Sequence, residues 1–180
     1  MILPSDERHE RSRIPRTERA AAPSLRELVT QLGWKTHERE DDSLLIDLEV
    51  PWGFLQATLE GTVESGARVF AEVSPLRASP STREALAEFL GIADASIRYV
   101  RSTLEEEVAS LRASFEARVD PEVEIEELAR AVEAVSVACS VFGREIRALE
   151  DEALAREYVA ARRTDSPPTA QRAGGLHGQD

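Results

Sequence analysis

The first half of the chain changes from a helical to a strand pattern of apolar residues. A capping box and apolar residues at helical spacing predict a short amphipathic helix over 24–32. Apolar and polar residues then alternate over 44–50, 54–63 and 68–73, which is typical of strands with one buried face. Turn residues between these segments favour three antiparallel strands, and a further short strand over 35–40 extends the first.

The second half begins with another short helix and two more strands. Ser81 is a suitable N-cap for a helix over 83–90, and Gly91 is expected to end it. Residues 97–104 have the composition of a strand. Residues 109–119 alternate strictly between apolar and polar side chains, which indicates a strand with one buried and one wet face.

A long C-terminal helix follows, for which Asp120 and Pro121 provide an N-cap and a first-turn proline. Its apolar residues recur every three or four positions from 125 to 149, and we expect this seam to lie on the sheet. We expect the helix to continue to Arg163, about 40 residues or roughly 60 Å in all. The sheet cannot cover that length, so the last turns would lie free or pair with another helix, for instance in a homodimer.

These elements predict an α+β domain with the order α-β-β-β-α-β-β-α. We expect an antiparallel sheet of about five strands, with helices mainly on one face and a long C-terminal helix. The domain would span 24–150, with a helical extension over 151–163. The ends, 1–23 and 164–180, contain prolines, glycines and few large apolar residues, so we predict that both are disordered.

Charge and apolar content exclude some classes of partner. The chain has a net charge of −12, and residues 24–150 alone carry 25 acidic and 13 basic residues. Such a surface repels phosphate, so no nucleic-acid partner is expected. No apolar run approaches the roughly 18–20 residues that span a bilayer, and the charged N-terminus does not resemble a signal peptide. We therefore predict a cytoplasmic protein with no membrane partner.

The sequence contains few residues that could form a catalytic or metal-binding site. Cys139 is the only cysteine, and its seam position in mid-helix predicts packing rather than reactivity. His37 is the only histidine of the domain, and the acidic pair Asp41-Asp42 lacks the spacing of a metal site. We therefore predict no catalytic residue, no cofactor and no metal. Gly143, inside the last helix, predicts a close contact or a bend.

Four residues are candidate partner or dimer contacts. Phe70 and Tyr99 fall on the opposite alternation from the apolar residues of their strands, so their rings would face solvent. Leu154 and Tyr158 lie on the helical extension that the sheet cannot cover.

Four stretches of the chain resemble a known family: LRELVTQLGW, GARVFAEVSP, REALAEFLGIADASIRYVR and the long helix after VDP. From Leu25 to Leu149 the chain resembles the YbjN family and, more distantly, type III secretion chaperones of the CesT class. The resemblance implies a small, acidic, often dimeric cytoplasmic protein that binds other proteins and has no known chemistry. We therefore predict a non-enzymatic, chaperone-like protein-binding module or regulatory adaptor. The alternatives are a type III secretion chaperone that binds an effector segment and, in another class, a small enzyme or thiol protein using Cys139.

Overall fold

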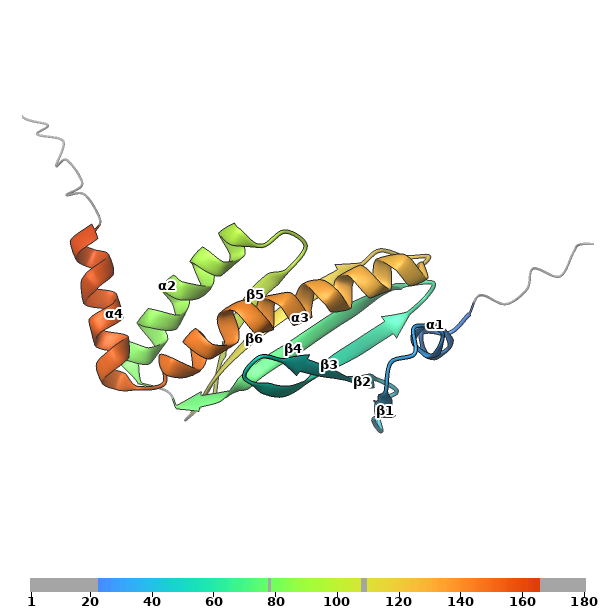
Figure 1. The fold of residues 1–180 in the computed structure, drawn as a ribbon, viewed down its shortest axis with the longest axis horizontal. Helices are drawn as coiled ribbons and strands as arrows, with labels where there is room; N and C mark the ends of the chain where they lie inside the picture. The colour runs from blue at the N-terminus through green and yellow to red at the C-terminus, as the bar shows by residue number, and fades with distance from the viewer. Residues whose placement is uncertain (1–22, 78, 108–109, 166–180) are drawn as a thin grey trace, which may run out of the picture.

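A six-stranded antiparallel sheet forms the centre of the protein (Figure 1). The computed structural model describes residues 23–77, 79–107 and 110–165, so nearly all of the two predicted disordered ends lies outside the described residues. The α+β class and the antiparallel sheet are confirmed. The short strand predicted over 35–40 forms a separate edge strand that pairs with the next one, which makes six strands in all. In sheet order the strands are β1 (Thr36–Glu38), β2 (Leu44–Val50), β3 (Gly53–Thr62), β4 (Gly66–Arg77), β6 (Ser110–Val119) and β5 (Arg101–Glu106).

Helices cover one face of this sheet. The long helix α3 (Ile125–Ala148) crosses β2, β4 and β6, and α2 (Pro80–Ser96) lies over β5 at the other edge. The short helix α1 (Leu25–Gln31) begins at the predicted capping box, and α4 (Glu152–Asp165) stands beside α2 (Figure 1).

The core lies between α3 and the alternating apolar residues of the strands. Ile46, Val69 and Phe115 of the sheet and Val135 and Ile146 of α3 are each 1% exposed or less. Burying one such side chain stabilises the fold by about 1.5–3 kcal/mol. The expectation that the apolar seam of the last long helix lies on the sheet is therefore confirmed for α3.

The second helix is longer than predicted at both ends. Ser79, rather than Ser81, accepts a hydrogen bond from the Thr82 amide as N-cap, and the helix passes through Gly91 to Ser96. It continues past the glycine because Ala93 in the next turn is buried, which outweighs the roughly 1 kcal/mol cost of glycine in a helix. The following strand therefore begins at residue 101 instead of 97.

The start of the third helix also differs from the prediction. Asp120 and Pro121 do not begin it, because the next residues are held by the β3–β4 hairpin: the Glu122 and Val123 amides donate to the Val63 carbonyl oxygen (2.8 and 3.2 Å). Val123 is buried there, and the helix begins only at Ile125.

The prediction of one continuous helix to Arg163 is wrong. The chain turns at residues 149–151, and α4 packs against α2 of the same molecule. Ala155 and Val159 are buried in this contact. The helical extension therefore packs against α2 of its own chain. The sequence pattern did not predict this contact, because α2 and α4 are far apart in the sequence.

Candidate functional site

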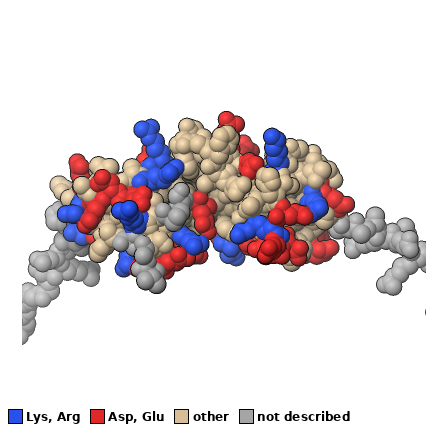
Figure 2. Space-filling view, turned by 90° about the horizontal axis from the view of Figure 1, so that it is seen from below, with Lys and Arg blue, Asp and Glu red and all other residues tan. Residues whose placement is uncertain are grey.

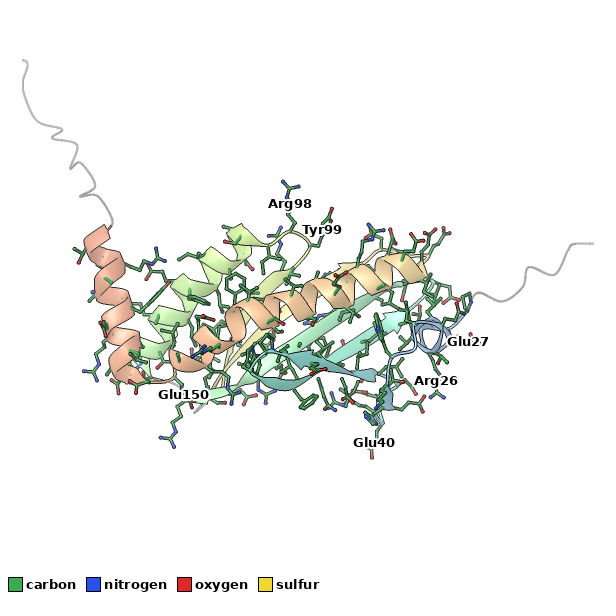
Figure 3. The ribbon with its side chains drawn as sticks, in the orientation of Figure 1. Arg26, Glu27, Glu40, Arg98, Tyr99 and Glu150 are labelled. Atoms are coloured by element: carbon green, nitrogen blue, oxygen red, sulfur yellow. The ribbon has the colours of Figure 1, made fainter. Side chains whose placement is uncertain are left out.

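An open groove lies between α3, the loop from α2 to β5 and the end of β6. Its volume is about 530 Å³. Figure 3 shows Arg98 and Tyr99 on the loop after α2, projecting outward from the ribbon. The lining residues are Ile97, Arg98, Tyr99, Ala117, Arg118, Val119, Asp120, Glu127, Arg130, Ala131, Glu133, Ala134 and Val137.

Tyr99 is held in solvent by the loop that carries it. The loop has apolar anchors on both sides of the tyrosine: Ile97 packs partly against the core, and Val100 is buried. Tyr99 itself is 85% exposed and has a φ of 70°, a left-handed conformation that is rare for an aromatic residue. Backbone strain of this kind persists only where the surroundings impose it and is concentrated at functional sites.

The α3 side of the groove carries apolar side chains that are not buried in the core. Val137 lines the groove and is 49% exposed, and Val141, one turn further along, is 54% exposed. Ala131 and Ala134 make this side shallow because their side chains are small. Beyond Val141, the ring of Phe142 meets Phe89 of α2, with centroids 5.9 Å apart, and this contact joins the two helices.

Charges of both signs surround this apolar surface in equal number. The lining includes three arginines and three carboxylates. Arg118 is paired with Glu116 of its own strand (3.2 Å), while the Arg130 side chain donates to the Glu126 carbonyl oxygen (3.4 Å). The groove is therefore electrically balanced, although the whole chain has a net charge of −12.

The four predicted contact residues do not come together, because Tyr99 alone of the four lines the groove. Phe70 lies partly buried on the sheet face opposite α3, with the Arg68 guanidinium 4.4 Å from its ring centroid. Leu154 is 47% exposed on α4. Tyr158 packs against Phe89 with ring centroids 6.1 Å apart, so its ring is partly buried in an intramolecular contact. Their role as contacts stays a prediction.

Sequence reasoning did not single out Val137 and Val141. A signal for them was present, because residues 135–142 contain more apolar residues than one seam can bury. A helix that uses one stripe to cover a sheet leaves the remaining apolar positions exposed. The excess predicts a second apolar surface on this helix.

Cys139 and Gly143 have packing roles on the core side of α3. Burial raises the pKa of the Cys139 thiol to about 12, so little reactive thiolate forms near neutral pH. The Trp52 indole N–H donates to the Cys139 carbonyl oxygen (3.0 Å). An added Cβ on Gly143 would lie 2.4 Å from Cζ2 of that indole. The close contact predicted at Gly143 is therefore with the Trp52 ring.

The described part of the chain contains neither a metal-binding cluster nor a membrane-spanning helix. Within residues 23–77, 79–107 and 110–165, no group of three or more histidine, cysteine or acidic side chains is arranged to hold a metal ion. Over the same part of the chain, no helix has the length and apolar character to cross a membrane.

Comparison with known proteins assigns this chain to a bacterial protein family. The sequence profile of the YbjN family, described as "putative bacterial sensory transduction regulator", matches residues 22–148. The chain therefore belongs to the YbjN family. The crystal structure of YbjN from E. coli, titled "a putative transcription regulator", is similar with a TM-score of 0.53 and 18% identity over 67% of this chain and 89% of that chain. This likeness shows the fold. No curated protein matches the sequence.

Proposed function

We propose that this chain is a non-enzymatic regulatory adaptor that binds a protein partner in the groove beside Tyr99. One observation carries the proposal: two exposed apolar side chains, Tyr99 at 85% and Val137 at 49%, line the same groove. Aromatic residues are enriched at protein interfaces and often dominate their binding energy. The strained backbone of Tyr99 adds support, because the loop maintains the ring in solvent at a cost in energy.

The balance of charges favours a protein over other macromolecular partners. A nucleic-acid or anionic lipid surface would require an excess of basic side chains, whereas the groove has arginines and carboxylates in equal number. On the face shown in Figure 2, acidic and basic side chains are also interspersed among neutral ones. An apolar centre with a polar rim of both signs is typical of protein–protein interfaces. We place this binding in the cytoplasm.

The shape of the groove indicates what the partner presents. Small residues of α3 form a shallow side, opposite the projecting Tyr99 ring. A partner helix or extended segment would place one or two bulky apolar side chains between them, with charged residues of both signs at the rim. Because such central contacts dominate interface energies, truncation of Tyr99 is expected to weaken binding about tenfold or more.

Site-specific photo-cross-linking in the native host tests the proposal. A benzophenone amino acid is placed at position 99, at position 137 or, as a matched control, at position 54, because Phe54 is 83% exposed but belongs to β3 and does not line the groove. We expect the same protein to be captured from positions 99 and 137 and not from 54. Equal capture at all three positions, or none at 99 and 137, would contradict the proposal.

A further inference from the structure

The turn between α3 and α4 contains no residue that requires a helix to stop. Leu149, Glu150 and Asp151 separate the two helices, and none of them is glycine or proline. None has a positive φ, and Leu149 itself is in the right-handed helical region (φ −71°, ψ −2°). A small change in a few backbone angles would therefore convert the turn into helix.

The hydrogen bonds across the turn are already close to helical. The Leu149 amide donates to the Glu145 carbonyl oxygen (3.1 Å), as in an α-helix, and the Ala155 amide donates to that of Asp151 (2.9 Å). Between them, the Glu150 and Asp151 amides bond to carbonyls three residues back (3.3 and 3.1 Å), and the Ala153 and Leu154 amides donate to the Asp151 side chain (2.8 and 3.1 Å). Straightening would replace these bonds by α-helical ones without loss of a backbone partner.

A straightened helix could not bury the apolar face of α4 on its own sheet. Successive residues of an α-helix are about 100° apart, so the nine residues from Ile146 to Ala155 correspond to roughly 180° around the axis. The buried stripe of α4 would thus point away from the sheet that α3 covers. Ala155 and Val159, both buried in the bent form, would be exposed unless a second molecule covered them.

The surface that fits α4 is shown by the bent form itself. Phe89 of α2 stacks edge-on against Tyr158, and Glu84 of α2 pairs with Arg163. A second copy of the chain presents the same α2 surface. We propose that α4 exchanges between two copies of the chain, each α3–turn–α4 segment straightening so that α4 packs on α2 of the partner copy. This domain swap does not depend on the groove or on its proposed function.

Two side chains stabilise the bent form and so oppose the exchange. Asp151 caps α4, since its Oδ1 accepts from the Ala153 and Leu154 amides (2.8 and 3.1 Å). Glu150, labelled at the turn in Figure 3, accepts from the Arg77 amide (3.3 Å). In a continuous helix these capped amides would instead bond to backbone carbonyls, so the Asp151 cap contributes only to the bent form.

Complementary charge reversals distinguish a swap from every other arrangement. Full-length Glu84→Arg and Arg163→Glu chains each place like charges across the α2–α4 contact of a single molecule. A swapped heterodimer of the two restores an opposite-charge pair at both contacts, and the side chains are exposed enough for both variants to fold. We expect the co-refolded mixture to contain several-fold more heterodimer than homodimer by native mass spectrometry. The double variant in one chain should dimerise like the wild type.

The turn supplies a second, independent readout. Removal of a helix cap in Asp151→Ala is expected to strengthen dimerisation by about 30-fold, because each of the two turns in the dimer contributes a factor of about five. Asp151→Asn, which keeps the capping oxygen, should leave dimerisation near wild type. Dimer dissociation constants from light scattering and sedimentation report this shift. A mixture that stays monomeric or forms only statistical amounts of heterodimer, or equal dissociation constants for the two Asp151 variants, would overturn the proposed exchange.

Discussion

Replacing Gly143 with alanine is expected to destabilise the protein, although alanine is the better helix residue. The new Cβ would lie 2.4 Å from Cζ2 and 2.9 Å from Cε2 of Trp52, both closer than van der Waals contact permits. The ring cannot move away freely, because its indole N–H donates to the Cys139 carbonyl oxygen (3.0 Å). The substitution therefore displaces the ring, strains α3 or does both.

The expected magnitude follows from three terms. Overpacking costs about 1–3 kcal/mol, and loss of the Trp52–Cys139 hydrogen bond costs about 1 kcal/mol. Alanine in place of glycine returns about 1 kcal/mol of helix propensity. The net loss in the free energy of unfolding should be about 1–3 kcal/mol for Gly143→Ala.

Gly91 provides a matched control within the same fold. It lies inside α2, where an added Cβ meets nothing within 4 Å and the φ is ordinary. Gly91→Ala should therefore stabilise the protein by about 0.5–1 kcal/mol through helix propensity alone.

Urea unfolding followed by far-ultraviolet circular dichroism measures these changes without relying on tryptophan fluorescence. A double-mutant cycle with Trp52→Leu isolates the contact: once the ring is gone, Gly143→Ala should stabilise the fold as Gly91→Ala does. The coupling between positions 52 and 143 should be about 1.5–4 kcal/mol, which is the loss expected with the ring present plus the gain expected without it. A coupling below about 0.5 kcal/mol, or stabilisation by Gly143→Ala in the presence of Trp52, would refute the reasoning.

Two further predictions concern titrating groups. With its pKa raised to about 12 by burial, the Cys139 thiol should react with a thiol reagent at pH 8 at least ~100-fold more slowly in the native state than after unfolding; surface-like labelling would contradict a packing role. Hydrogen bonds from the Ser24 amide and hydroxyl lower the pKa of Glu27 from its ordinary 4.5. Because the pKa of Glu27 is lower in the folded state, ionised Glu27 stabilises the fold above pH 4.5. This stabilisation is lost as the pH falls through the folded-state pKa of Glu27. NMR titration should show a depressed Glu27 pKa that returns toward 4.5 in Ser24→Ala, and an unchanged value would count against the capping box.

The sequence predicted those parts of the fold that depend on local periodicity. The capping box at Ser24, the alternation in β2, β3, β4 and β6, and the seam of α3 all appear in the structure. Each rests on a repeat that a strand or helix imposes on its own residues, so no knowledge of distant contacts is required.

The elements that were predicted wrongly depend on distant contacts. The helix break at 149–151 contains no glycine or proline. It is stabilised by the Asp151 cap of α4 and by the packing of α4 against α2, which is distant in the sequence. The late start of α3 depends in the same way on the Val63 carbonyl oxygen of a remote hairpin.

The candidate site was predictable only in part. Strand alternation predicted that Tyr99 faces solvent. In the structure Tyr99 is exposed, but it lies on the loop before β5, with a left-handed backbone and the groove beside it. Val137 was not predicted because the apolar residues of this helix were assigned to one buried stripe, whereas α3 also carries a second, exposed one. The grouping of these residues in space depends on how the α2–β5 loop approaches α3, which no local pattern specifies.

The central claim, that the groove beside Tyr99 binds a protein partner, is tested most directly by calorimetric titration of the full chain with the protein captured at position 99. The account predicts that Tyr99→Ala weakens this binding about tenfold or more, while Phe54→Ala, which removes an equally exposed ring outside the groove, leaves the dissociation constant within about twofold of wild type. Equal affinities for wild type and Tyr99→Ala, or a loss confined to Phe54→Ala, would contradict it.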